Sequence, residues 1–421
     1  MFLRQVCYVL LCMQRQKIKP SKLHSYQLRR VRELVKYAHE NVKHYANSQY
    51  QQQIQTLEEI ERLPLIHKKD LKEAGIDGFT DPKVVCRKST VVCRTSGSTG
   101  EPIKIYHDGN TYDYHTAAGV RRVLATGKYR PYYRLLHIRP IPLERRLFER
   151  FGLFRRKIIP AYTPINKIKE QILREAPDGL VSYPVYLRDI ISVLAKQERD
   201  QIRKHLKIIF TESEILTDHQ REYIQSYFGV EIFDDYSAYE SLSITFECRC
   251  HRHHIVEDRL LLEVVDDQGR AVPDGAEGNI VLTSFFERAM PLIRYSIGDR
   301  GVRSSEPCPC GRTFRTLILT QGRAEECLLL KNGEKIYSAT MLHLAAQLEG
   351  ASDVCICQEK KGELTVYYVP INNETDNEAT ENFIRDYFAN YVGKECELKI
   401  CATKAVPRTK GGKARLIYTA P

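Results

Sequence analysis

The sequence predicts an α/β fold in which a large N-terminal α/β domain is followed by a small α+β C-terminal domain. At 421 residues the chain is too long for one small hydrophobic core, so two domains are expected. In the middle of the chain, short apolar segments alternate with helical patterns, which is typical of a largely parallel sheet. From Leu260 onward, two β runs surround a turn rich in Gly, Pro and Asp.

The first sixty residues have a helical pattern. Apolar residues recur there at the spacing of one helix face: Leu28, Val31, Leu34, Val35 and Ala38. An earlier apolar run, from Val6 to Met13, is too short to span a bilayer, and no small-residue cleavage site follows it. We therefore expect a buried amphipathic helix and no transmembrane segment, with an uncleaved surface anchor as the alternative.

The stretch 93-CRTSGSTGEPIKIY-106 lies between expected strands at 91–93 and 103–105, and a helix is expected at 110–126. Glycine N–H groups and hydroxyl groups together form a concave donor surface that suits phosphate oxygens. Lys104 would add a positive charge. This is not a Walker motif, because Gly100 is followed by Glu101 and Pro102. A phosphate-binding loop is favoured over a surface turn.

The last hundred residues predict a compact α+β module, with helices near 338–349 and at 379–391 and several strands. The boundary is expected near 323-RAEE-326, which gives domains over 1–322 and 323–421. The tail contains TKGGKAR, a glycine-rich and basic run whose composition indicates a mobile loop, although most such charge runs are surface tails.

Charge and cysteine content limit the setting and the partners. The net charge of +11 favours anionic partners, and nucleotides or acidic carriers satisfy it as well as nucleic acid does. The thirteen cysteines are scattered and odd in number, so we expect no disulfide framework and a reducing cytoplasm.

Two Cys/His-rich turns, 247-ECRCHRHH-254 and 307-PCPCGR-312, resemble the halves of a tetrahedral Zn²⁺ site. Cys308 and Cys310 fit one half. The other half is open among five residues: Cys248, Cys250, His251, His253 and His254. A site with four protein ligands would be structural, because it keeps no open position. Unrelated surface residues are the alternative.

Ordered motifs along nearly the whole chain carry a resemblance to a known family. TSGSTGEPIKI is similar to the phosphate-binding signature of adenylate-forming enzymes, the acyl-CoA synthetase and adenylation-domain superfamily. Within it the chain resembles the branch of phenylacetate-CoA ligases, CapK-like proteins and coenzyme F390 synthetases. The other resembling segments are LPLIHKKDL, DDYSAYE, MPLIRYSIGDRG, GRAEE and VPRTKGGKARL.

The resemblance implies a reaction in which ATP and a carboxylate give acyl-AMP and pyrophosphate, after which a nucleophile displaces AMP. Its phosphate-binding residues would be Ser96, Gly97, Ser98, Thr99, Gly100 and Lys104. Asp299 would bind both ribose hydroxyls. Tyr236 and the backbone of Asp235 would flank the adenine, and Arg323 would lie near the ribose.

The resemblance also assigns the catalytic groups. Glu240 matches the glutamate that binds Mg²⁺. Lys413 matches the catalytic lysine, and Lys410 is its competitor. Glu325 stands at the hinge, where the family usually has Asp. Cys248 and His254 match the Cys and His positions that this branch often carries, and with Cys308 and Cys310 they complete the expected zinc set.

The sequence names neither the acid nor the acceptor. Tyr183, Pro184 and Tyr186 favour an apolar or aromatic acid, although core packing explains them equally well. The acceptor is CoA, a carrier phosphopantetheine or an amine. The oligomeric state is open, with a dimer among the options. The alternatives are a zinc-containing nucleic-acid-binding protein, which leaves the ordered motifs unexplained, and a non-catalytic AMP-binding relative.

Overall fold

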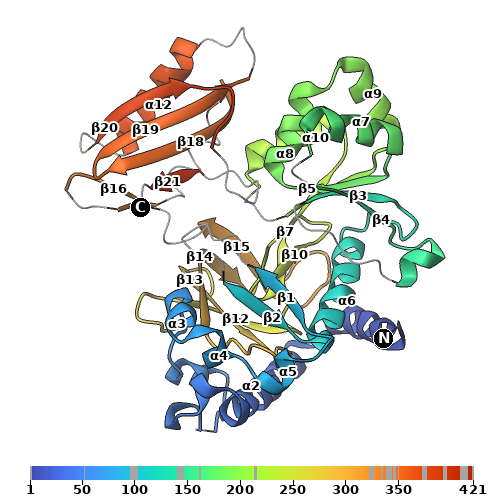
Figure 1. Ribbon diagram of the computed structural model, residues 1–421, viewed down its shortest axis with the longest axis vertical. Coiled ribbons are helices and arrows are strands. Elements are labelled where there is room, and N and C mark those ends of the chain that lie inside the picture. The colour runs from blue at the N-terminus through green and yellow to red at the C-terminus, as the bar shows by residue number, and fades with distance from the viewer. Residues whose placement is uncertain are drawn as a thin grey trace. The chain divides into compact units, whose positions relative to one another are not determined.

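The computed structural model describes residues 2–421 except 52, 95–102, 140–146, 161–162, 213–215, 322–326, 333–334, 338–343, 345–347, 349, 372–376, 392–395, 408–415 and 420–421. Its described parts form two compact units. One contains Met1–Pro131 with Phe233–Thr320, and the other contains Tyr132–Ile232 with Gln321–Pro421. Helices and sheets occur in both (Figure 1), which confirms the α/β fold class. The boundary at 322/323 stays a prediction.

The first unit begins with helices. They are α1 (Phe2–Arg15), α2 (Pro20–Asn41), α3 (Lys68–Glu73), α4 (Gly75–Phe79), α5 (Pro82–Val85) and α6 (Gly109–Ala125), with 3₁₀ turns η1 (Lys43–Tyr45), η2 (Ser48–Tyr50) and η3 (Glu58–Arg62). α2 buries the expected face, including Val31 and Leu34. α1 is helical as expected, but its apolar run is only partly buried, because Val6 is 40% exposed and Leu10 is 59% exposed. No helix among the described residues is long and apolar enough to cross a bilayer.

A six-stranded antiparallel sheet supports the site in this unit. Its order is β10 (Thr245–Glu247), β11 (His253–Ile255), β15 (Thr316–Gln321), β14 (Tyr295–Ser304), β13 (Glu277–Ser284) and β12 (Leu260–Val265). Two short antiparallel ribbons accompany it, β1 (Val91–Arg94) with β2 (Lys104–His107) and β8 (Ser237–Ala238) with β9 (Leu242–Ser243). The apolar side chains of β2 pack in one core with α2 and Tyr295, which anchors β2 beside the sheet.

The Tyr132–Ile232 stretch confirms the expected alternation of strand and helix. The sheet order is β4 (Arg156–Pro160), β3 (Leu135–Arg139), β5 (Gly179–Ser182), β6 (Ile208–Glu212) and β7 (Ile232–Asp235). The pairs β3–β4, β3–β5 and β5–β6 are parallel. The other elements are η4 (Leu147–Phe151), α7 (Ile165–Glu175), α8 (Pro184–Val193), α9 (Lys196–His205) and α10 (Asp218–Phe228).

The C-terminal stretch has its own hydrophobic core of leucine, valine and aromatic side chains. A four-stranded sheet has the order β20 (Glu397–Ala402), β19 (Glu363–Pro370), β18 (Ala351–Lys360) and β21 (Ile417–Thr419). Helix α12 (Asn377–Tyr391) contributes Ile384, Tyr387 and Phe388 to that core, and a ribbon is formed by β16 (Cys327–Leu329) and β17 (Lys335–Tyr337). This mixture is the α+β module that the sequence predicts, and most of the helix expected near 338–349 lies outside the described residues.

Candidate active site

The hydroxyl-and-glycine stretch lies between two paired strands, as expected. β1 and β2 are antiparallel, and Arg94 pairs with Lys104 at the end of the ribbon where residues 95–103 connect the two strands. The predicted phosphate-binding residues Ser96, Gly97, Ser98, Thr99 and Gly100 lie outside the described residues. Lys104 is described, and its side chain is exposed at the point where the chain re-enters the ribbon.

Two residues predicted to bind the nucleoside lie side by side. The Tyr236 hydroxyl donates to Asp299 Oδ2 at 2.5 Å, although the two are 63 positions apart in the sequence. Such a short contact is typical of a hydroxyl that donates to a carboxylate. Next to Tyr236, the side chain of Asp235 accepts from Arg122 Nη1 of α6 at 2.7 Å.

A β-bulge accounts for the direction of Asp299. Asn279 of β13 pairs with Arg300 and Val281 pairs with Ser296, so two steps along β13 match four along β14. The bulge contains Gly298, whose φ of 88° lies in the left-handed region that glycine adopts without strain. Bulges of this kind redirect side chains next to active sites. The glycine of YSIGD is therefore needed to present the aspartate.

The predicted Mg²⁺ ligand, Glu240, has a hydrogen-bond partner on β14, the strand that also carries Asp299. Glu240 is half-buried, and its Oε1 accepts from the hydroxyl of buried Tyr295 at 3.3 Å. Tyr295 and Asp299 both belong to β14, so one strand serves both predicted ligand-binding carboxylates. Sequence reasoning missed Tyr295, although it stands inside MPLIRYSIGDRG, because a tyrosine in such a motif reads equally well as core.

A Cys/His cluster lies where the turn between β10 and β11 meets the loop between β14 and β15. The ligand atoms of Cys248, His254, Cys308 and Cys310 all lie within 4.8 Å of one another. The Sγ atoms of Cys248 and Cys308 are 3.7 Å apart, and Cys310 Sγ is 3.2 Å from His254 Nε2. Zn–S bonds of about 2.3 Å in a tetrahedron place sulfurs about 3.8 Å apart. The spacing thus fits a tetrahedral metal ion.

The protonation state of His254 also fits metal binding. Its Nδ1 donates to the backbone carbonyl of Phe314 at 2.8 Å, which directs Nε2 toward Cys310. Burial lowers the pKa of His254 to about 4, so the imidazole is neutral near pH 7. The burial of Cys248 raises the pKa of its thiol to about 12, so a bound cation would have to displace that proton.

The rival ligands have other contacts. His251 stacks on Phe233 with ring centroids 4.9 Å apart. His253 Nδ1 lies 3.0 Å from the hydroxyl of Thr245. Cys250 contributes its backbone N–H, which donates to Cys248 Sγ at 3.4 Å. The structure therefore brings together the set that the family resemblance implied.

Comparison with known proteins finds relatives over most of the chain. The model of the CapK C-terminal domain family matches residues 328–420. A phenylacetate-coenzyme A ligase of Aromatoleum evansii is 23% identical over 434 residues, covering 96% of this chain and 95% of the relative. Another, of Thermus thermophilus, is 27% identical over 341 residues, covering 75% and 73%. The chain is thus similar to phenylacetate-CoA ligases over most of its length, and its last part is similar to the CapK C-terminal domain.

Solved structures of adenylate-forming enzymes share the fold. 2-Hydroxyisobutyryl-CoA ligase, in the postadenylation state with an acyl-AMP, aligns with a TM-score of 0.78 at 21% identity over 97% of this chain and 91% of that one. An anthranilate CoA ligase in complex with anthranoyl-AMP aligns with a TM-score of 0.58 at 18% identity, over 76% and 65%. These likenesses confirm a large N-terminal domain and a smaller C-terminal one.

Three further residues with predicted roles lie outside the described part of the chain. They are Arg323, Glu325 and Lys413. Their assignments stay predictions, as do the roles of the five phosphate-loop residues. The described part of the site consists of Tyr236, Glu240, Tyr295 and Asp299, the last two of them on β14.

Proposed function

We propose that this protein activates a carboxylic acid with ATP and then forms a thioester with CoA. The observation that carries the proposal is the grouping of Asp299 with Tyr236 and of Glu240 with Tyr295 along one bulged strand. Acid–CoA ligases related over nearly the whole chain support the same chemistry.

Atoms and charges balance in two steps. The substrate carboxylate attacks the α-phosphorus of ATP, a new P–O bond forms, and the bond to pyrophosphate breaks. The thiol then gives its proton to solvent, its sulfur attacks the acyl carbon, and AMP leaves with the electrons of the cleaved acyl C–O bond. Because the first step joins two anions, electrostatic stabilisation is the main requirement. Lys413 would supply it at the α-phosphate, and residues 96–100 with Lys104 would hold the departing phosphates.

Asp299 would accept hydrogen bonds from the ribose hydroxyls, and its contact with Tyr236 orients the carboxylate for that purpose. Glu240 suits a hard cation, since it offers carboxylate oxygens in a half-buried setting and one of them is oriented by Tyr295. When bound, Mg²⁺ would offset the charge of the phosphate oxygens. Arg323 would lie near the ribose.

The C-terminal module would move between the two steps. Lys413 must approach the α-phosphate for adenylation and then leave room for the thiol, and a hinge near Glu325 would serve both positions. In support, 2-hydroxyisobutyryl-CoA ligase has been solved in a postadenylation state and in a thioesterification state.

The Cys/His cluster would hold one structural Zn²⁺ through Cys248, His254, Cys308 and Cys310. It would link the turn between β10 and β11 to the loop between β14 and β15. Metal analysis of protein purified without chelator should give about one zinc per chain. A metal-free protein with intact fold would refute this assignment.

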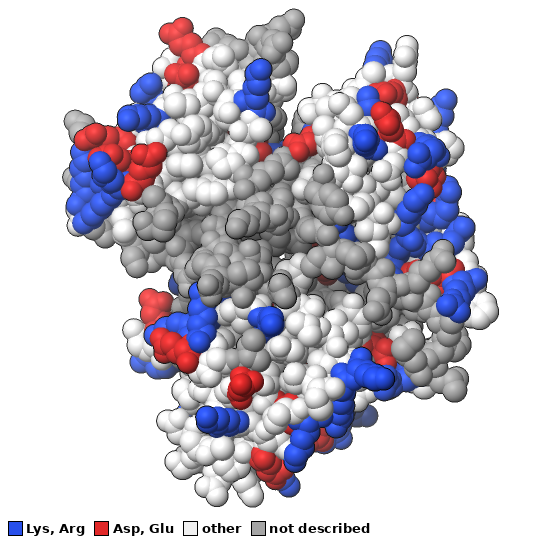
Figure 2. Space-filling model, viewed as in Figure 1, with Lys and Arg blue, Asp and Glu red and all other residues white. Residues whose placement is uncertain are grey.

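Two features guide the choice of substrate and acceptor. Tyr183 and Tyr186 are buried in the core of the Tyr132–Ile232 stretch, so they support an aromatic acid only if the acyl pocket reaches that core. Lys and Arg side chains gather along one side of this stretch (Figure 2). A basic surface suits CoA phosphates or an acidic carrier.

Pyrophosphate release across a panel of carboxylic acids with ATP and Mg²⁺ tests the proposal. We expect turnover with at least one aromatic or short-chain acid, together with AMP formation and hydroxamate trapping of the acyl-AMP. Thioester formation on addition of CoA identifies the acceptor. AMP binding without acid-dependent turnover would instead support the non-catalytic alternative.

A further inference from the structure

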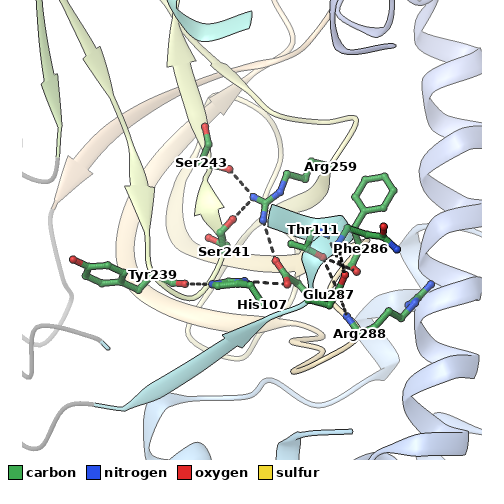
Figure 3. A network of polar contacts seen from close by, with 11 residues as sticks. His107, Thr111, Tyr239, Ser241, Ser243, Arg259, Phe286, Glu287 and Arg288 are labelled. Carbon is green, nitrogen blue, oxygen red and sulfur yellow. Dashed lines mark hydrogen bonds and ion pairs between the residues drawn. The ribbon is translucent and has the colours of Figure 1, made fainter. Parts of the chain in front are cut away.

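A buried polar network contacts Tyr239, Ser241 and Ser243, the residues on either side of Glu240 in the sequence (Figure 3). His107, at the end of β2, contacts Glu287 Oε2 through Nδ1 at 3.0 Å and the Tyr239 carbonyl through Nε2 at 2.8 Å. Arg259 Nη2 donates to the other oxygen of Glu287 at 3.0 Å. The side chains of His107, Glu287 and Arg259 are each only 1% exposed.

Positive and negative side chains alternate in the network, in the order His107, Glu287 and Arg259. Burial lowers the pKa of His107, but the neighbouring Glu287 carboxylate and the Cys93 side chain outweigh it and raise the pKa to about 10. His107 is therefore an imidazolium near pH 7, and both of its N–H groups donate. Glu287 stands between two cations, His107 and Arg259. Removing its charge would leave both cations buried without compensation, which is costly.

The network donates hydrogen bonds to the backbone before and after Glu240, and part of that backbone is strained. His107 donates to the carbonyl of Tyr239, and Arg259 Nη1 donates to the carbonyls of Ser241 and Ser243. Between these carbonyls, Leu242 has a φ of 58°, which a leucine seldom adopts. Such a conformation persists only where the surroundings over-determine it, and here Arg259 donates on either side of it.

We propose that His107, Glu287 and Arg259 are positioning residues, which fix the 239–243 backbone so that the carboxylate of Glu240 is held in place to bind the ATP-associated cation. The inference rests on the proposed function, because it takes Glu240 as the cation ligand. Tyr295 orients the carboxylate itself, and the network orients the backbone from which it projects.

The position of the network in the chain supports a role beyond stability. His107 ends the strand that follows the predicted phosphate loop, and Glu287 lies three positions before the MPLIRYSIGD segment that carries Tyr295 and Asp299. Beside it, Asp108 caps α6 and accepts from the backbone N–H of Arg288. The network thus joins three segments that the proposed function assigns to phosphate, cation and ribose.

Replacement of Glu287 by Gln, which keeps the shape and removes the charge, tests the proposal in acid-dependent ATP–pyrophosphate exchange. We expect the half-saturating Mg²⁺ concentration to rise at least about tenfold, as is typical when groups behind a metal ligand are changed. The rate at saturating Mg²⁺ should largely recover. His107→Gln is a milder second variant, used below its unfolding temperature if Glu287→Gln folds poorly.

Glu149→Gln is the matched control, because Glu149 pairs with Arg156 at 2.5 Å with both side chains 8% exposed or less, in the other unit. It should leave the Mg²⁺ midpoint unchanged. An unchanged midpoint in Glu287→Gln and His107→Gln would overturn the proposal, whatever happens to stability.

Hydrogen–deuterium exchange gives a readout that does not depend on turnover. Amides of residues 239–243 should exchange faster in Glu287→Gln than in the wild type or in Glu149→Gln. If the wild-type enzyme turned over no acid, the proposed function would fail, and exchange would still report on the network. Unchanged protection of this segment would overturn the inference by itself.

Discussion

The contact between Tyr236 and Asp299 illustrates how single residues shape this site. A phenol that donates to a carboxylate fixes the direction of its lone pairs, so ribose hydroxyls would meet a pre-oriented acceptor. The same hydroxyl competes with the ligand for the charge of Asp299. The observed arrangement favours orientation, because the other oxygen and the remaining lone pairs of the carboxylate are enough for two ribose hydroxyls.

Tyr236→Phe removes this hydroxyl and keeps the ring. We expect the KM for ATP to rise about tenfold, since a hydrogen bond to a charged group contributes about 1.5–3 kcal/mol. Steady-state pyrophosphate release at varied ATP measures it. Tyr132→Phe is the control, because Tyr132 is 63% exposed. An unchanged KM for ATP would show that the phenol does not orient Asp299 for the nucleoside.

At this scale the sequence predicted some residues and missed others. Asp299 and Glu240 stand in motifs that resemble a family, and each has the neighbours that such a role needs. The sequence analysis did not identify the network of His107, Arg259 and Glu287. His107 ends a strand and the other two lie in distant loops, and no sequence spacing relates these positions. Only the packing of β2 against the 285–295 segment brings them together.

At the scale of elements, the Cys/His cluster depends on the hairpin formed by β10 and β11. In that hairpin Phe246 pairs with His254, and His251 takes a φ of 53° in the turn. In this turn the His251 ring stacks on Phe233, whereas His254 lies next to Cys310 of the 308–310 loop. The motif spacing predicted both halves of the cluster. It could not separate five candidate ligands, because the choice follows from the turn geometry.

Cys308→Ser should weaken metal binding and loosen both turns. We expect the melting temperature to fall by at least about 5 °C and zinc content to drop below half, because metal binding to a formed site adds directly to folding stability. Differential scanning fluorimetry with metal analysis measures both. Cys401→Ser, at an exposed position, serves as the control. Equal melting temperatures for the two variants would contradict a structural metal.

At the scale of the whole molecule, strand and helix periodicity predicted the α/β class and the C-terminal α+β module. It did not predict the exposure of Val6 and Leu10 on α1, because a helical pattern shows which residues share a face and not how much of that face is covered. Periodicity also did not predict which segments form each compact unit, because each unit joins segments that are far apart in the chain.

The central claim is that one chain performs two half-reactions with a lysine needed only in the first. It is tested most directly by assaying both half-reactions of Lys413→Ala, with Lys410→Ala as the control. We predict that acid-dependent ATP–pyrophosphate exchange falls at least about 100-fold, since Lys413 would stabilise charge in that transition state. Thioester formation from supplied acyl-AMP should remain close to the wild-type rate. Equal loss of both half-reactions, or no loss of the first, would contradict the account.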